Sequence, residues 1–204
     1  MSLKEMVADG DLYTIEDFVI KALETRKPLD ITDELIAGLQ LAGDRFQKEE
    51  YFVIDMLQAA ETFKEAMKVL KPKLGERKTD YIGKFLIGTV KGDIHDIGKN
   101  LVSIMLEGAR FEVIDLGIDV SADQFIEAIK KYEPQIVGLS ALLTTTMLEM
   151  EEIIKAIGEA NLRDKVKIMV GGAPVSERYA SSIGADSYSN NASEAIENAI
   201  GLIK

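Results

Sequence analysis

The chain has 204 residues and a formal net charge of −11, and its 47% hydrophobic and 29% charged residues are typical of a soluble protein of one or two domains. The 35 acidic side chains outnumber the 24 basic ones, which disfavours a nucleic-acid-binding surface, and the absence of Cys excludes disulfides, thiolate metal sites and Cys nucleophiles. There is no run of 18 apolar residues, and charges stand where a signal peptide would have an apolar core. We therefore expect a cytoplasmic protein that does not cross a membrane.

The first 70 residues predict a small helical bundle. From Tyr51 to Leu70, apolar residues recur at the i, i+3, i+4, i+7 spacing of one helix face. Further helices are predicted over residues 2–9, 14–25 and 30–47. Four short helices give only a marginal core, so we expect one face of the bundle to pack against another part of the structure. We place this domain at residues 1–75, and the polar stretch 71–80 with its Pro and Gly predicts a linker.

Residues 81–204 alternate between strand and helix patterns. The predicted strands are 85–90, 112–117, 136–140, 167–172 and 186–189. The predicted helices are 98–109, 121–131, 147–160, 175–183 and 191–203. This alternation predicts an α/β fold, a flavodoxin-like (Rossmann-like) domain with a five-stranded parallel sheet and helices on both faces. Ligands of such domains bind at the carboxyl ends of the strands.

The one His of the chain, His95, follows the first predicted strand and therefore lies at that edge. Asp93, two residues earlier, could accept the proton of one imidazole nitrogen and leave the other free for a metal. Gly92 and Gly98 would allow a tight bend and the approach of a bulky ligand. The loop also fits a surface His beside an Asp, or a phosphate-binding loop, although neither common nucleotide-binding Gly pattern is present. A zinc site would need further nitrogen or sulfur ligands, so a metal on His95 would have to bring most of its own ligands, as a macrocycle does.

Two further segments lie at the same predicted edge. Ser140–Thr146 follows the third strand with several hydroxyl groups, and Gly171–Pro174 follows the fourth with a Gly pair that could open a slot between strands. Each pattern has an ordinary interpretation as well, since Ser and Thr cap helices and Gly pairs form turns.

Together, these segments form a spaced set. Asp93-x-His95-x-x-Gly98 is followed after 41 residues by Ser140-x-Leu142, and after 28 more by Gly171-Gly172. This set resembles the signature of the cobalamin domain of methionine synthase. It resembles more closely the small corrinoid proteins that serve methyltransferase systems for methanol, methylamines or aryl methyl ethers. The resemblance covers nearly the whole chain, including the N-terminal helices.

The resemblance implies that cobalamin or methylcobalamin binds base-off, with His95 as the lower axial ligand of its cobalt. Asp93 would hydrogen-bond His95, and Thr146 would continue that chain where methionine synthase has a Ser. Phe46 and Val53 match two residues of the helical cap that shield the upper face of the corrin, although both would also fit an ordinary bundle core. The complete set of implied cofactor-binding residues is Asp93, Ile94, His95, Gly98, Ser140, Leu142, Thr144, Thr146, Gly171, Gly172, Ala173, Tyr188, Phe46 and Val53.

The implied function is that of a methyl carrier without catalytic residues of its own. A substrate:corrinoid methyltransferase would load a methyl group onto cob(I)alamin, and a methylcorrinoid:acceptor methyltransferase would remove it. A reductive activator protein is a further implied partner. The methyl donor, whether methanol, a methylamine, an aryl methyl ether or betaine, would be chosen by the partner enzyme.

Three other functions compete with this interpretation. The small subunit of an adenosylcobalamin-dependent mutase shares the loop motif, but the helical cap with Phe46 speaks against it. A cobalamin-sensing transcription factor would carry a DNA-binding module and a Trp in its bundle, and this chain has neither a Trp nor a basic surface. A plain flavodoxin-like response domain would leave the three spaced motifs as coincidence.

Overall fold

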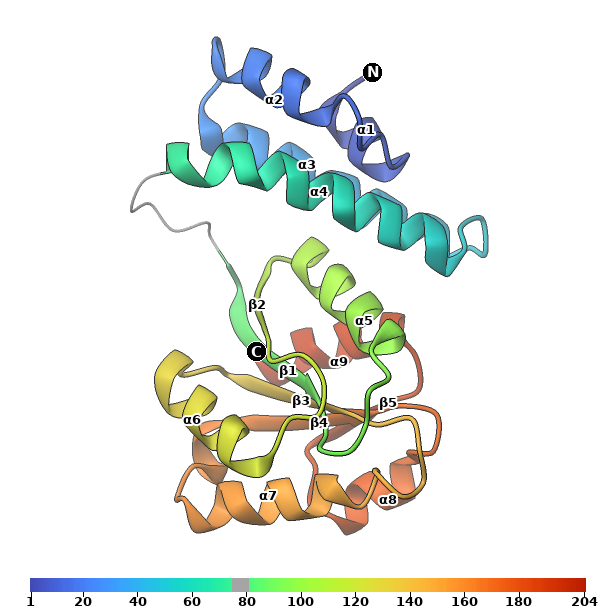
Figure 1. Ribbon diagram of the computed structural model, residues 1–204, viewed down its shortest axis with the longest axis vertical. Coiled ribbons are helices and arrows are strands. Elements are labelled where there is room, and N and C mark those ends of the chain that lie inside the picture. Colours follow the sequence, from blue (N-terminus) through green and yellow to red (C-terminus); the bar gives the residue numbers. More distant parts are fainter. Residues whose placement is uncertain (75–80) are drawn as a thin grey trace. The chain divides into compact units, whose positions relative to one another are not determined.

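The computed structural model describes residues 1–74 and 81–204. The chain divides into two compact units, which Figure 1 shows as a group of helices and a sheet with its covering helices. One unit is Met1–Tyr81 with Ile104–Arg110, and the other is Ile82–Ser103 with Phe111–Lys204.

The first unit contains the four predicted N-terminal helices. They are α1 (Leu3–Ala8), α2 (Ile15–Leu23), α3 (Pro28–Gln47) and α4 (Val53–Leu74). Helix α3 begins two residues earlier than predicted because Pro28 occupies its first turn, where the missing N–H of Pro costs nothing. The predicted linker is wrong over residues 71–74, which continue α4. Pro72 removes a single backbone hydrogen bond near the end of an already long helix, so the helix survives it. Residues 75–80 of that prediction lie outside the described residues.

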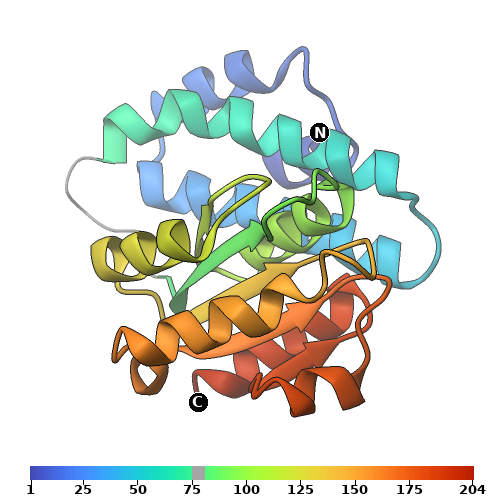
Figure 2. The ribbon, with the colours of Figure 1, turned by 60° about the horizontal axis from the view of Figure 1, so that its bottom comes forward.

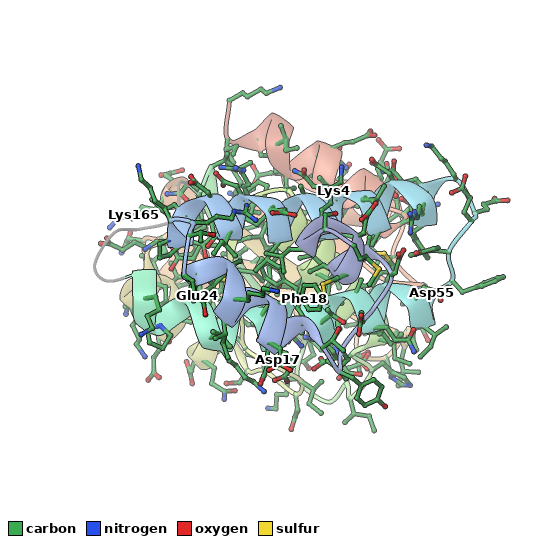
Figure 3. All side chains as sticks on the ribbon, turned by 90° about the horizontal axis from the view of Figure 1, so that it is seen from above. Lys4, Asp17, Phe18, Glu24, Asp55 and Lys165 are labelled. Carbon is green, nitrogen blue, oxygen red and sulfur yellow. The ribbon has the colours of Figure 1, made fainter. Side chains whose placement is uncertain are left out.

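The predicted apolar stripe of α4 is buried, as Met56, Ala60 and Leu70 show. Helix α1 crosses α3 closely, because a Cβ added at Gly38 would stand 2.6 Å from the Val7 side chain. Helix α2 is mostly exposed and buries only Ile15 and Val19. Its exposed side chains include Asp17 and Phe18, which Figure 3 labels.

The second unit is built on a five-stranded parallel sheet with strand order β2-β1-β3-β4-β5, which confirms the predicted fold class. Its strands are β1 (Gly83–Thr89), β2 (Phe111–Asp115), β3 (Ile136–Ser140), β4 (Lys167–Gly171) and β5 (Ser187–Ser189). Its helices are α5 (Ile97–Gly108), of which the part from Ile104 belongs to the first unit, α6 (Ala122–Tyr132), α7 (Glu149–Glu159), α8 (Glu177–Ser182) and α9 (Ala192–Leu202), with a 3₁₀ turn over Arg163–Lys165. Every predicted strand and helix of this region is present, with bounds that differ by at most two residues.

The helices cover both faces of the sheet. Helices α5 and α9 lie on one face, and α6, α7 and α8 lie on the other (Figures 1 and 2). The central strands are apolar because both of their faces are covered, and Leu86, Val137 and Ile168 are fully buried.

The register aligns the carboxyl ends of the strands. Thr89 of β1 pairs with Ser140 of β3, Ser140 pairs with Gly171 of β4, and Gly171 pairs with Ser189 of β5. The chain reverses its strand order between β1 and β3, so the loops that follow these two strands meet at the switch point where ligands of such folds bind.

Candidate cofactor site

The loops after β1 and β3 meet at the buried carboxylate of Asp93. Its Oδ1 accepts hydrogen bonds from the His95 backbone N–H (3.0 Å) and from the His95 ring Nδ1 (2.7 Å). Its Oδ2 accepts from the Leu142 N–H (2.8 Å) and from the Thr146 hydroxyl (2.6 Å). Asp93 is 0% exposed, so these four bonds hold a fully buried group between two loops.

The four donors keep this buried carboxylate charged. Burial by itself raises the pKa of Asp93, but the hydrogen bonds from Thr146, Leu142 and His95 outweigh it and bring the pKa well below the ordinary value of 3.8. An ionised carboxylate can only accept, so the short contact at His95 Nδ1 requires that this nitrogen carry the proton. In the neutral ring the lone pair of His95 therefore lies on Nε2, the tautomer that a metal ligand needs.

The side chain of His95 is 46% exposed, so only one edge of the ring is held by the protein. Its backbone is held separately, because the buried Thr89 hydroxyl donates to the His95 carbonyl oxygen (3.0 Å). His95 thus has a fixed Nδ1, a fixed backbone and an accessible Nε2. This arrangement can present one nitrogen to a metal that arrives with its other ligands.

A second polar network lies just after the loop, at the start of α5. Lys99 is almost completely buried and pairs with Asp115 at the end of β2, while its ammonium also donates to Asn100 (2.7 Å). The Asn100 side chain in turn donates to Asp96 (3.0 Å). The network ties the first turn of α5 to the sheet. Our sequence analysis missed it because Lys99 and Asp115 are 16 residues apart and neither belongs to a recognisable motif.

Large apolar side chains are exposed on the segments that follow the strands at this edge. They are Ile94, Ile97, Ile118, Leu142, Leu143 and Leu148. Exposed apolar side chains gathered beside a few fixed polar groups are typical of a site for a large, mostly apolar ligand. Ile94 and Leu142 were predicted from the sequence. The other four follow β1, β2 or β3, so the predicted strand ends were the signal that could have found them.

The glycines of the site have different roles. A Cβ added at Gly98 would meet no protein atom within 4 Å, so nothing in the chain requires Gly there and the space beside it is open to a ligand. Gly172 has φ +124°, and its Cβ would stand 1.9 Å from the Ala141 carbonyl oxygen. Gly172 is therefore required by the close approach of the chain segments after β3 and β4. A Cβ at Gly171 would meet the Ser189 carbonyl oxygen at 3.1 Å.

The remaining predicted residues fall into two groups. Ser140, Thr144, Ala173 and Tyr188 lie on or directly after β3, β4 and β5 near their carboxyl ends, and the Tyr188 hydroxyl donates to Asn190 (3.2 Å). Phe46 lies in the last turn of α3 and Val53 begins α4, so both belong to the helical unit. Their shielding role stays a prediction.

The site fits a corrinoid on its own geometry. It offers one imidazole with a free Nε2, an apolar rim and an unfilled space at Gly98, which suits a flat macrocycle that supplies its own equatorial ligands. Within residues 1–74 and 81–204, no group of three or more His, Cys, Asp or Glu is arranged to hold a metal ion.

Residues 83–197 match the B12 binding domain family, and residues 2–71 match a further family of that description. The chain belongs to the corrinoid proteins of methyltransferase systems. It is 38% identical to a corrinoid protein of Desulfitobacterium hafniense, over 96% of this chain and 93% of the relative. It is 41% identical to the trimethylamine corrinoid protein of Methanosarcina barkeri, over 95% of this chain and 91% of the relative.

Solved structures agree with this assignment. The methanol:cobalamin methyltransferase complex MtaBC from Methanosarcina barkeri contains a chain that matches with a TM-score of 0.91 and 26% identity, over 99% of this chain and 78% of that one. These relatives favour the corrinoid carrier over a mutase subunit or a cobalamin-sensing regulator. No helix among the described residues is both long and apolar enough to cross a membrane.

Proposed function

We propose that this corrinoid protein carries a methyl group between two methyltransferases and that His95 is the lower axial ligand of its cofactor, bound base-off. When bound, the corrinoid supplies a cobalt that takes up and gives back the methyl group. The observation that carries the proposal is the chain of short hydrogen bonds from Thr146 through Asp93 to Nδ1 of His95.

The protein residues have separate tasks in this proposal. Asp93 keeps the proton on Nδ1 and thereby the lone pair on Nε2, and its negative charge makes the imidazole a stronger donor. Thr146 stabilises the carboxylate from the other side, which keeps Asp93 charged while His95 binds and leaves the metal. The His95 ring could leave the metal without disturbing the loop, because the His95 backbone is held by Asp93 and Thr89 independently of the ring.

The rest of the cofactor would contact the neighbouring loops. The nucleotide tail would run between the strand ends, in contact with Ser140, Leu142, Thr144, Gly171, Gly172, Ala173 and Tyr188, and Ile94 and Gly98 would lie against the corrin. We assign cofactor binding to residues 81–204 and shielding of the upper face, through Phe46 and Val53, to residues 1–75. The partners would be a substrate:corrinoid and a methylcorrinoid:acceptor methyltransferase, with a reductive activator protein. Because several relatives are named for trimethylamine and dimethylamine, methylamine methyltransferases are the first partners to test.

The test uses the fact that the chain has a single His. Tag-free protein labelled with nitrogen-15 only at histidine is reconstituted with cobalamin, reduced to the cob(II) form and measured by electron paramagnetic resonance. The label is expected to change the axial nitrogen splitting. In a parallel sample the label is placed in the dimethylbenzimidazole base of the cofactor instead, and no change is expected. A splitting that follows the cofactor's label would overturn the base-off, His-on assignment.

A further inference from the structure

Asp119, in the loop between β2 and α6, makes two hydrogen bonds to the loop that carries His95. The Asp119 Oδ1 accepts a hydrogen bond from the Gly92 N–H (2.7 Å). The Asp119 N–H donates to the Asp93 carbonyl oxygen (3.1 Å). Asp119 therefore binds the backbone on both sides of the Gly92–Asp93 peptide link, and one of its two partners, Asp93, is the residue that fixes the His95 ring.

The backbone of Asp119 makes this double contact possible. Its φ is +54°, in the left-handed region that non-glycine residues seldom adopt and that Asp tolerates better than most. Gly92 has φ +79°, so both partners of the contact adopt the left-handed conformation. The neighbouring Val120 N–H donates to the Thr89 carbonyl oxygen (3.0 Å), and Val120 forms a parallel bridge with Val90. The loop after β2 is thus held against the chain on the carboxyl side of β1, with Asp119 at the turn.

This contact is separate from the carboxylate relay, the chain of hydrogen bonds from Thr146 through the Asp93 carboxylate to His95. The side chain of Asp93 orients the ring of His95, whereas Asp119 fixes the backbone from which that side chain starts. The relay can hold Nε2 in one place only if the Asp93 backbone itself does not move. Asp119 touches neither His95 nor Thr146 in the described hydrogen bonds, so it would act only through the position of the loop.

We propose that Asp119 is a positioning residue for the axial ligand, which clamps the Gly92–Asp93 peptide so that His95 is presented to the cobalt. The proposal rests on the proposed function, in which His95 binds the metal. Asp119 itself would not touch the cobalt. Its loss would shift the balance from His-on towards His-off without removing the imidazole or its Asp93 partner.

Two substitutions in the full chain separate the clamp from the backbone conformation. Asp119→Gly adopts the left-handed backbone without strain and removes the side-chain acceptor, and it also makes the backbone at this position more flexible. Asp119→Asn keeps an acceptor oxygen and also tolerates the left-handed backbone. In the apo-protein, we expect hydrogen exchange at the Gly92 amide to be about tenfold faster in the Gly variant, because the free energy of one net hydrogen bond corresponds to about that factor. In the Asn variant the exchange rate should stay near that of the wild type.

In the cobalamin-loaded protein, the ratio of His-off to His-on cob(II) is read from the nitrogen-15 histidine splitting. We expect this ratio to rise about threefold to tenfold in Asp119→Gly and to be restored in Asp119→Asn, since one surface hydrogen bond sets the scale. An unchanged ratio in the Gly variant would overturn the clamp, whether or not Gly92 exchange increased. If the wild-type protein itself showed no histidine splitting, the proposed function would fail instead, so the two failures are distinguishable.

Discussion

Replacement of Asp93 by Asn tests the centre of the site. The wild-type carboxylate accepts two hydrogen bonds on each oxygen, and Asn offers one oxygen and one NH₂ group. If the NH₂ faced His95, it would meet the His95 N–H and force the ring proton onto Nε2. If it faces Leu142, only the Leu142 N–H loses its acceptor, because the Thr146 hydroxyl can turn to the Leu143 carbonyl oxygen (3.1 Å). The second orientation disrupts less, so we expect it.

The size of the effect follows from this geometry. One partly buried N–H without an acceptor costs about 1–3 kcal/mol, and the loss of charge weakens the remaining bonds, so the free energy of unfolding should fall by about 2–4 kcal/mol. A domain of ordinary stability still folds after such a loss. The His95 tautomer is retained in this orientation, but the imidazole is a poorer donor. We therefore expect the equilibrium constant for His95 binding to the cobalt to fall about tenfold. This is the lower end of the range seen when a residue that hydrogen-bonds a metal ligand is replaced.

Two assays check the expected loss of stability and the expected fall of the His-on equilibrium constant. Urea unfolding of the apo-protein measures the stability, and the nitrogen-15 histidine splitting of bound cob(II) measures the His-on equilibrium. Asp96→Asn is the matched control, because Asp96 lies one residue after His95 but its carboxylate accepts from the Asn100 amide and not from the ring. We expect little change in either assay for that control. An Asp93→Asn protein with wild-type stability and a wild-type His-on equilibrium would refute the reasoning about the buried carboxylate.

Four further outcomes are expected. Thr146→Ala should lower the His-on equilibrium constant less than Asp93→Asn does, because the hydroxyl lies one hydrogen bond further from His95. Thr146→Ser should restore the constant, and equal effects of Ala and Ser in the same nitrogen-15 splitting would contradict this. Phe46→Ala should leave cobalamin affinity unchanged but speed photolysis of bound methylcobalamin, and unchanged photolysis would reassign Phe46 to the bundle core. Gly172→Ala should lower the melting temperature severely or prevent folding because of the 1.9 Å clash, whereas Gly98→Ala should fold normally and only weaken cobalamin binding in a titration. Because the folded-state pKa of Asp93 lies below its unfolded value, the stability it contributes is present above about pH 4 and lost as the pH falls further, and the slope of apo-protein stability against pH in that range should decrease in Asp93→Asn.

The order of elements could be predicted from the sequence because local patterns determine it. Strands β1 to β4 contain short apolar runs, β5 is a short β-prone segment, and the helices between strands show helical spacing, so the parallel sheet and its ligand edge follow from general rules. The single His could be placed at that edge for the same reason. The end of α4 could not be predicted, because Pro and Gly near residues 72–75 suggest a break that a long preceding helix overrides.

The contacts within the site depend on pairs that are far apart in the sequence. Asp93 binds Leu142 and Thr146, which are 49 and 53 residues away, and Asp119 is 27 residues from Gly92. The resemblance to methionine synthase suggested Thr146, but no local pattern marks a backbone N–H such as that of Leu142 as a partner. Asp119 was missed because its role depends on a left-handed backbone, which the flanking residues do not reveal.

In the proposed function, the buried carboxylate makes the loop after β3 part of the metal site. A charge on Asp93 strengthens His95 as a ligand, but a buried charge without partners would be neutralised by a rise in its pKa. The loop around Asp93 supplies donors from His95 alone, which occupy one oxygen. The other oxygen is satisfied only by Leu142 and Thr146, so the charge on Asp93, and with it the donor strength of His95, depends on the position of the loop after β3. In the proposed function, a ligand that moved Leu142, which is exposed at the same edge, would therefore alter the donor strength of His95 without touching His95.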